Sequence, residues 1–216
     1  MGSEWDTYQP RISRKVTFME QRDVRANTKQ SFIKTARRLF AEQGFKGTTM
    51  NAIAQSTGKS RRTLYTYFRT KQDIYMEVIR MELHNLYKEL KAFVARPLSP
   101  IQKLMQYIAR RQVAVNDVVR WNGSLEAEFF NDIAAVERAR LRFDLLERDL
   151  IEQILKEGIE SGEFKRLDIK RTALLLHACM KGLEVPFIRG HLGKTDEAVG
   201  ETYRTVRSII SHGLCK

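Results

Sequence analysis

The 216-residue sequence has few of the features that would support disulfide-rich, metal-binding or membrane-spanning proteins. Its two cysteines, Cys179 and Cys215, cannot build a disulfide framework, so a cytoplasmic compartment with reduced thiols is the simple interpretation. The four histidines show no metal-ligand spacing with one another or with cysteine, and we expect no metal site. The longest apolar stretch, residues 172–180, is far shorter than the ~20 residues of a membrane span.

Motifs for catalysis and for secretion are also missing. The sequence contains no glycine-rich phosphate loop, no nucleophile elbow and no His-Glu-x-x-His pattern. The N-terminus lacks the apolar segment of a signal peptide. We therefore expect a protein that is not an enzyme, and an enzyme acting on a small molecule is the least favoured hypothesis.

The charge, by contrast, is abundant and uneven. The formal net charge is +12. Residues 1–96 contain 19 Lys and Arg against 9 Asp and Glu, whereas residues 97–216 contain 19 against 17. This asymmetry predicts a basic module that binds a polyanion, followed by a nearly neutral module with another role. The alternative is that the basic residues only make the surface soluble.

The periodicity of apolar residues is helical almost throughout, which predicts an all-α fold of about nine helices. We expect the first helix to begin near Asn27, an N-cap residue. Pro97 and Pro100 mark the main boundary. The predicted organisation is a flexible basic arm, a helix-turn-helix DNA-binding domain, a connecting helix, and a ligand-binding and dimerisation domain, at residues 1–26, 27–73, 74–96 and 97–216.

Two short helices separated by Gly58 indicate a helix-turn-helix. The first begins after Thr48 or Thr49, and the second covers residues 60–67. In such a motif the second helix enters the major groove of DNA. Leu64 is its one firmly apolar residue and should anchor the helix from beneath.

The other side chains of the second helix suit DNA. Arg61 and Arg62 can bind guanine edges or phosphates. The hydroxyls of four residues can donate to phosphate oxygens: Ser60, Thr63, Tyr65 and Tyr67. Lys71, at the start of the next helix, suits a phosphate. The alternatives are that both tyrosines are core aromatics and that both arginines lie on a solvated face.

Residues 49–68, TMNAIAQSTGKSRRTLYTYF, with the preceding AEQGFKGTTM and the following RTKQDIY, resemble the signature of the tetracycline-repressor (TetR/AcrR) family of bacterial transcription regulators. The resemblance covers roughly residues 28–80. It implies that Thr49, the helix at residues 60–67 and Lys71 contact the operator. Lys59 stands where the family usually has a small apolar residue, and Arg62 where glycine is frequent. Both add charge at the DNA face.

The segment at residues 168–187 is apolar nearly all round, so we expect it to be buried on more than one face. Packing with the last helix, residues 196–212, against a second copy would form a four-helix interface and a homodimer. In such a dimer, the two copies of the helix at residues 60–67 would bind the two halves of a palindromic DNA site. The alternative is a core helix buried inside a monomer.

The family resemblance also implies a small-molecule effector bound between the C-terminal helices, with no other cofactor. Candidate ligand contacts are Met105, Tyr107, Trp121, Phe129, Phe130, Phe143 and His177. Arg111, Glu126 and Glu128 are candidate polar contacts. For each of these residues, an ordinary core position is the alternative.

The leading hypothesis is a cytoplasmic, ligand-responsive repressor that leaves a palindromic operator when an effector binds. The alternative is a DNA-coating or spatial-regulation protein of the same fold that acts through a protein partner. Steep salt dependence without sequence preference would distinguish this alternative.

Overall fold

The computed structural model describes residues 11–121, 133–188, 191–192 and 196–215. Within these residues it contains eight α-helices and no strand beyond one isolated β-bridge between Phe164 and Cys215, which confirms the all-α fold. Residues 124–130, whose sequence also favours a short helix, lie outside the described part of the chain. In that part, no helix combines the length and apolar character needed to cross a membrane.

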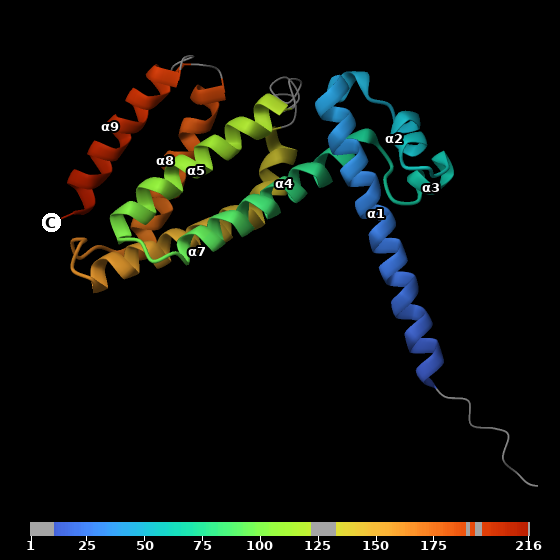
Figure 1. Cartoon of the computed structure of the whole chain (residues 1–216), viewed down its shortest axis with the longest axis horizontal. Coiled ribbons are helices and arrows are strands. Elements are labelled where there is room, and N and C mark those ends of the chain that lie inside the picture. The colour runs from blue at the N-terminus through green and yellow to red at the C-terminus, as the bar shows by residue number, and fades with distance from the viewer. Residues whose placement is uncertain (1–10, 122–132, 189–190, 193–195, 216) are drawn as a thin grey trace, which may run out of the picture.

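Helix α1 (Arg11–Gly47) begins earlier than the sequence predicts. The expected start at Asn27 and the expected flexible arm are wrong for residues 11–26, which are helical. The physical reason is that no glycine or proline occurs between residues 11 and 43, so a good cap residue at position 27 does not stop the helix. Residues 22–27 are exposed, and this end of α1 projects away from the other helices (Figure 1).

The C-terminal half of α1 forms one side of the first hydrophobic core. Five apolar residues at helical spacing form a stripe on α1 that is fully buried: Phe32, Ile33, Ala36, Leu39 and Phe40. Gly44 adopts a φ of 71°, a left-handed conformation that turns the chain toward the next helix. Buried residues of α2, α3 and α4 and of the start of α7 complete this core.

The helix-turn-helix consists of α2 (Met50–Ser56) and α3 (Arg61–Tyr65), with Gly58 at a φ of 66° between them. Thr49 is the N-cap of α2, since its hydroxyl accepts a hydrogen bond from the Ala52 N–H at 3.1 Å. Thr48 is instead fully buried. Its hydroxyl lies within hydrogen-bond distance of two carbonyl oxygens of α1, at 3.1 Å from Leu39 and 2.8 Å from Gly44. The recognition helix is shorter than the predicted residues 60–67.

Helix α4 (Lys71–Val94) connects the two halves of the molecule (Figure 1). It begins with a capping box, because Thr70 and Asp73 each accept a hydrogen bond from the other's backbone N–H. The predicted break at the prolines is also present, since α5 (Pro100–Trp121) begins a new direction there. Helix α4 contributes buried residues to both hydrophobic cores, so it packs in both halves of the molecule.

The second core is formed by the C-terminal helices α5, α7 (Ile133–Glu160), α8 (Ile169–Ile188) and α9 (Asp196–Leu214), together with the end of α4. Pro186 lies inside the last turns of α8. Helices α8 and α9 occupy the end of the molecule opposite α2 and α3 (Figure 1). Any contact that α8 and α9 make with a second copy is therefore far from the helix-turn-helix of the same chain.

Candidate functional site

The recognition helix α3 has one inner and one outer face. Leu64 is 0% exposed and fixes the helix to the core, as the sequence predicts. Arg61 and Arg62 are exposed at its first turn, and Lys59 is exposed just before it. Leu64 is the one fully buried residue of α3, and the exposed side presents the positive charges of Lys59, Arg61 and Arg62.

The two tyrosines differ in position. Tyr65 is 44% exposed, and the Arg61 guanidinium carbon lies 6.0 Å from its ring centre. Tyr67 is half-buried against Phe32, with ring centres 5.7 Å apart. The core alternative therefore does not hold for Tyr65 and holds in part for Tyr67.

Hydroxyl groups at this face also fix the start of α3. The Ser60 hydroxyl accepts a hydrogen bond from the Thr63 N–H at 3.0 Å, which caps the helix. Its oxygen lies 2.9 Å from the Thr63 hydroxyl. Thr49, Ser60 and Lys59 are exposed and Thr63 is half-buried, so all four predicted residues lie around the helix-turn-helix.

Lys71 links the start of α4 to the segment that precedes the helix-turn-helix. Its ammonium donates hydrogen bonds to the carbonyl oxygens of Phe45 at 2.5 Å and Thr48 at 2.8 Å. It also lies 4.3 Å from the centre of the Phe45 ring. The first turn of α4 is thereby tied to the segment between α1 and α2, a role that spacing in the sequence could not reveal.

We expect Lys71→Met to lower the free energy of unfolding by about 1–3 kcal/mol, because two carbonyls lose a charged donor. Binding of specific and random DNA should weaken alike. Urea denaturation and DNA titration measure the two effects. Lys59→Met, which removes an exposed lysine, is the matched control and should change stability by less than about 0.5 kcal/mol. Equal stability of Lys71→Met and the wild type would contradict the bracing role.

Sequence reasoning missed Arg25, which it assigned to the flexible arm. In α1 this residue is exposed, and its guanidinium carbon lies 5.8 Å from the centre of the Tyr67 ring. The uninterrupted run of residues without glycine or proline was the available signal. Arg25 extends the basic surface beside α3.

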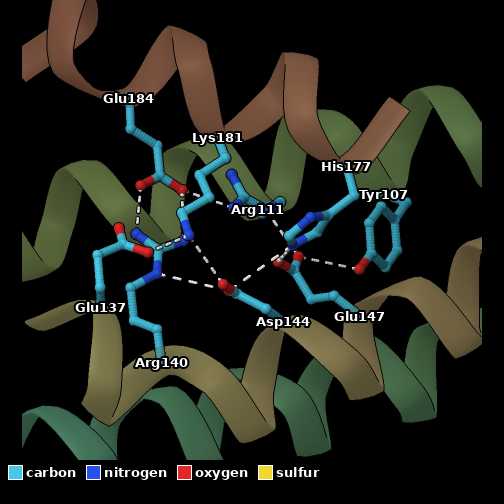
Figure 2. A network of polar contacts seen from close by, with 9 residues as sticks. All are labelled: Tyr107, Arg111, Glu137, Arg140, Asp144, Glu147, His177, Lys181 and Glu184. Carbon is cyan, nitrogen blue, oxygen red and sulfur yellow. Dashed lines mark hydrogen bonds and ion pairs between the residues drawn. The ribbon is translucent and has the colours of Figure 1, made fainter. Parts of the chain in front are cut away.

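The predicted ligand contacts fall into three groups. Met105 and Phe143 pack in the second core. Tyr107 and His177 lie together in a polar cluster inside the C-terminal helices (Figure 2). The side chains of Trp121, Phe129 and Phe130, like those of Glu126 and Glu128, lie outside the described part of the chain.

One pocket of about 450 Å³ lies between α1, the start of α4 and the start of α7. Tyr67, Gln72, Met76 and Arg138 are among its lining residues. The pocket is at the junction between the DNA-binding helices and the C-terminal helices. None of the four predicted ligand contacts whose side chains are described lines it.

The polar cluster, which we call the ionic network, joins three helices (Figure 2). Its members are Tyr107 and Arg111 of α5, Glu137, Arg140, Asp144 and Glu147 of α7, and His177, Lys181 and Glu184 of α8. Most of them are buried. Sequence reasoning named only Tyr107, Arg111 and His177.

Arg111 is the centre of the network. Its Nε donates to Glu147 Oε1 at 2.6 Å and its Nη2 to Glu184 Oε1 at 2.5 Å. Arg140 donates to both oxygens of Glu184, with Nη2 2.9 Å from Oε1. The Tyr107 hydroxyl donates to Glu147 Oε1 at 3.0 Å. These contacts link α5, α7 and α8 through charge-assisted hydrogen bonds.

Burial and neighbouring charge shift the pKa values in this network. Burial favours the neutral form of Glu147, but the Arg111 charge outweighs it and holds the pKa of Glu147 below its usual value. Burial, reinforced by the Glu147 charge, raises the pKa of Tyr107. Burial lowers the pKa of His177, but contacts with Asp144 and Glu147 outweigh burial and raise it. Glu147 therefore stays ionised inside the protein.

A sequence signal for this network existed. Arg140, Asp144 and Glu147 occur at positions i, i+4 and i+7 of one helix, and His177, Lys181 and Glu184 repeat that spacing on another. Residues with this spacing share a helix face. Two such charged rows can pair across helices, but the pairing partner is decided only by the tertiary structure.

Helix α8 also has an exposed apolar face. Its buried side includes Ala173 and Met180, whereas Leu174 and Leu175 are exposed, the latter at 57%. Ile209 on α9 is exposed as well. The described residues leave this side of α8 exposed, which contradicts the alternative of a core helix buried inside a monomer.

Comparison with known proteins identifies the family. The family model for bacterial regulatory proteins of the tetR family matches residues 32–78. The chain is similar to the HTH-type transcriptional regulator AcrR of Shigella flexneri, with 27% identity over 168 residues, covering 72% of this chain and 76% of AcrR. It also resembles a solved transcriptional regulator from Cytophaga hutchinsonii, with a TM-score of 0.72, 20% identity, and coverage of 86% of this chain and 97% of that one.

Similarity to the HTH-type transcriptional regulator RutR of Escherichia coli O157:H7 extends over almost the full length of both proteins. The identity is 33% over 211 residues, which covers 93% of this chain and 96% of RutR. This similarity includes both the helix-turn-helix and the C-terminal helices. The chain therefore belongs to the tetR family of bacterial regulatory proteins and is a helix-turn-helix DNA-binding transcriptional regulator.

Proposed function

We propose that this regulator binds a palindromic operator as a homodimer and represses transcription until a small-molecule effector releases it. The observation that carries the proposal is the outward face of α3, where Arg61 and Arg62 are exposed while Leu64 is fully buried. A helix anchored by one residue and charged on its free side is shaped to enter a major groove. The proposed role requires no catalysis and places the protein in the bacterial cytoplasm, where its DNA is.

We propose that some side chains contact the DNA bases and others contact the phosphates. Arg61 and Arg62 would contact guanine edges, since a guanidinium matches two acceptors on guanine. Hydroxyl and ammonium groups would bind phosphates and fix the register. The proposed positioning residues are Thr49, Lys59, Ser60, Thr63, Tyr65, Tyr67 and Lys71.

The exposed apolar face of α8 and α9 supports dimerisation through the last two helices. Leu174 and Leu175 on α8 and Ile209 on α9 would be covered by the same surface of a second copy. The four-helix interface would fix the separation of two copies of α3. A palindromic site would then match the two-fold symmetry of the protein.

The proposed effector acts through the helices that join the two halves. Residues 27–73 would form the DNA-binding unit, residues 74–96 the connecting helix and residues 97–216 the effector and dimer unit. Because α4 packs in both cores, a shift of the C-terminal helices would change the tilt of α3. The effector would prefer the arrangement that cannot span both half-sites, which lowers DNA affinity.

A titration of DNA from upstream of the regulator's own gene tests the proposal. We expect a palindrome there to bind more tightly than a shuffled sequence at every salt concentration. Arg61→Ala and Arg62→Ala should each weaken operator binding by about 1–3 kcal/mol. Arg142→Ala, which removes an exposed arginine of α7, is the matched control and should bind like the wild type. Equal binding of palindrome and shuffled DNA would overturn the proposal.

A further inference from the structure

Three side chains of metal-ligating type converge inside the ionic network where α7 faces α8 (Figure 2). Asp144 and Glu147 are three residues apart on α7, so their carboxylates leave the same helix face. His177 projects toward them from α8. One ligand atom from each residue lies within 4.8 Å of the other two. Glu147 is fully buried, and His177 is 6% exposed.

The inner atoms of this cluster have no hydrogen-bond partner: Asp144 Oδ1, Glu147 Oε2 and His177 Nε2. His177 Nε2 is 3.3 Å from Glu147 Oε2 and 3.6 Å from Asp144 Oδ1. Both separations exceed the ~2.7–2.9 Å of a charge-assisted hydrogen bond. When His177 Nε2 carries no proton, three lone pairs face one another, and a cation between them removes the repulsion.

The two separations measured from His177 Nε2 suit a metal ion as that cation. Zinc binds imidazole nitrogen and carboxylate oxygen at about 2.0–2.2 Å. Two ligands at such distances, in tetrahedral or octahedral arrangement, are about 3.0–3.5 Å apart. The two separations measured from His177 Nε2 are close to this range.

The outer oxygens of the two carboxylates are already held by other residues. Glu147 Oε1 accepts hydrogen bonds from Tyr107 at 3.0 Å and Arg111 at 2.6 Å. Asp144 Oδ2 accepts from Lys181 at 2.9 Å. In metal sites, such partners orient the ligands and increase affinity. Of the two inner oxygens, Asp144 Oδ1 also lies 3.5 Å from Arg140 Nε, an ion pair too long for a hydrogen bond. The inner oxygens are those that would bind the ion.

The charge of the network permits one further cation. Three basic side chains, Arg111, Arg140 and Lys181, face four carboxylates. The carboxylates are Glu137, Asp144, Glu147 and Glu184. The carboxylates outnumber these three cations by one, although the Glu137 side chain is 42% exposed. Either a proton on His177 or a metal ion can balance that charge.

We propose that Asp144, Glu147 and His177 bind a divalent transition-metal ion that links α7 to α8, with water in its remaining coordination positions. One imidazole and two carboxylates suit zinc or manganese better than magnesium, which prefers oxygen ligands and keeps its waters. The sequence expectation of no metal site considered only the spacing of histidine and cysteine. It could not detect a site that two helices build from one histidine and two acids.

Calorimetric titration of the chelator-treated full-length protein with Zn²⁺ alone tests this site. We expect one Zn²⁺ per chain, and at least about 10-fold weaker binding of Mg²⁺. Absence of Zn²⁺ binding by the wild type would overturn the proposal and would leave a proton on His177 as the cation. So would equal affinity for Mg²⁺, because the imidazole would then not be a ligand.

Two variants and two matched controls locate the ion. Loss of a hydrogen-bond partner of a metal ligand costs about 10- to 100-fold in affinity, so His177→Gln and Asp144→Asn should each cost at least about 100-fold. His84→Gln and Asp149→Asn remove exposed residues of the same types and should bind Zn²⁺ like the wild type. Unchanged affinity in His177→Gln would overturn the assignment. Circular dichroism checks that each variant is folded.

X-ray absorption of the Zn²⁺-loaded wild type gives a readout that needs no variant. We expect nitrogen and oxygen neighbours with the multiple scattering of one imidazole. A sulfur neighbour would place the ion at a cysteine and overturn the proposal. Because none of these measurements uses DNA, failure of the metal site would leave the proposed function intact, and failure of operator binding would leave the metal site intact.

Discussion

Glu184→Ala is expected to lower the free energy of unfolding by about 3–5 kcal/mol. Glu184 accepts hydrogen bonds from both Arg111 and Arg140, and all three side chains are buried. Removing the carboxylate leaves two guanidinium groups inside the protein without this acceptor, and buried cations without partners are costly. Urea denaturation followed by circular dichroism at a fixed protein concentration measures the loss.

The matched control for this prediction is Glu201→Ala. Glu201 forms an ion pair with Arg204 at 3.8 Å, but both side chains are exposed. Such a surface pair contributes at most about 1 kcal/mol, so the control should be nearly as stable as the wild type. Equal losses of stability in the two variants would contradict the prediction that the buried network contributes more to the free energy of unfolding than a surface ion pair does.

Leu175→Glu is expected to convert the protein to a monomer and to weaken operator binding by about 100- to 10,000-fold. The side chain is 57% exposed within its own chain, so a charge there does not disturb the core. In the proposed dimer the same charge would be buried against a second copy. A monomer binds two half-sites independently and loses the gain that comes from linking them. Analytical ultracentrifugation and operator titration measure the two effects.

Leu141→Glu is the control for the dimer prediction. Leu141 is an exposed leucine of α7, 61% exposed, and it lies outside α8 and α9. This variant should remain dimeric and bind the operator normally. A dimeric Leu175→Glu protein would place the interface on another surface.

The DNA-binding helices could be predicted well because their signals are local. Thr49 and Thr70 are N-caps within one turn of the groups that they bond, and Gly44 and Gly58 supply left-handed turns. Leu64 is the one firmly apolar residue of its helix, so its burial followed directly. The start of α1 was mispredicted because a cap residue permits a helix to begin but does not require it.

The bracing role of Lys71 could not be predicted, because its two carbonyl partners lie in a different segment. The ionic network was missed for a related reason. Each row of charges is visible in the sequence as a helix face, but a row facing solvent and a row facing another helix look the same. Only the packing of α5, α7 and α8 decides that these charges are buried and paired.

The sequence by itself determined the all-α class, the helix-turn-helix with its glycine turn, and the basic character of the first half, because these depend on neighbours within a few residues or on composition. The tertiary structure alone decided which charges meet inside the C-terminal helices, what holds Lys71, and which face of α8 is left uncovered. The physical reason is distance along the chain. Contacts between helices depend on how those helices pack, and that packing cannot be read from any one segment.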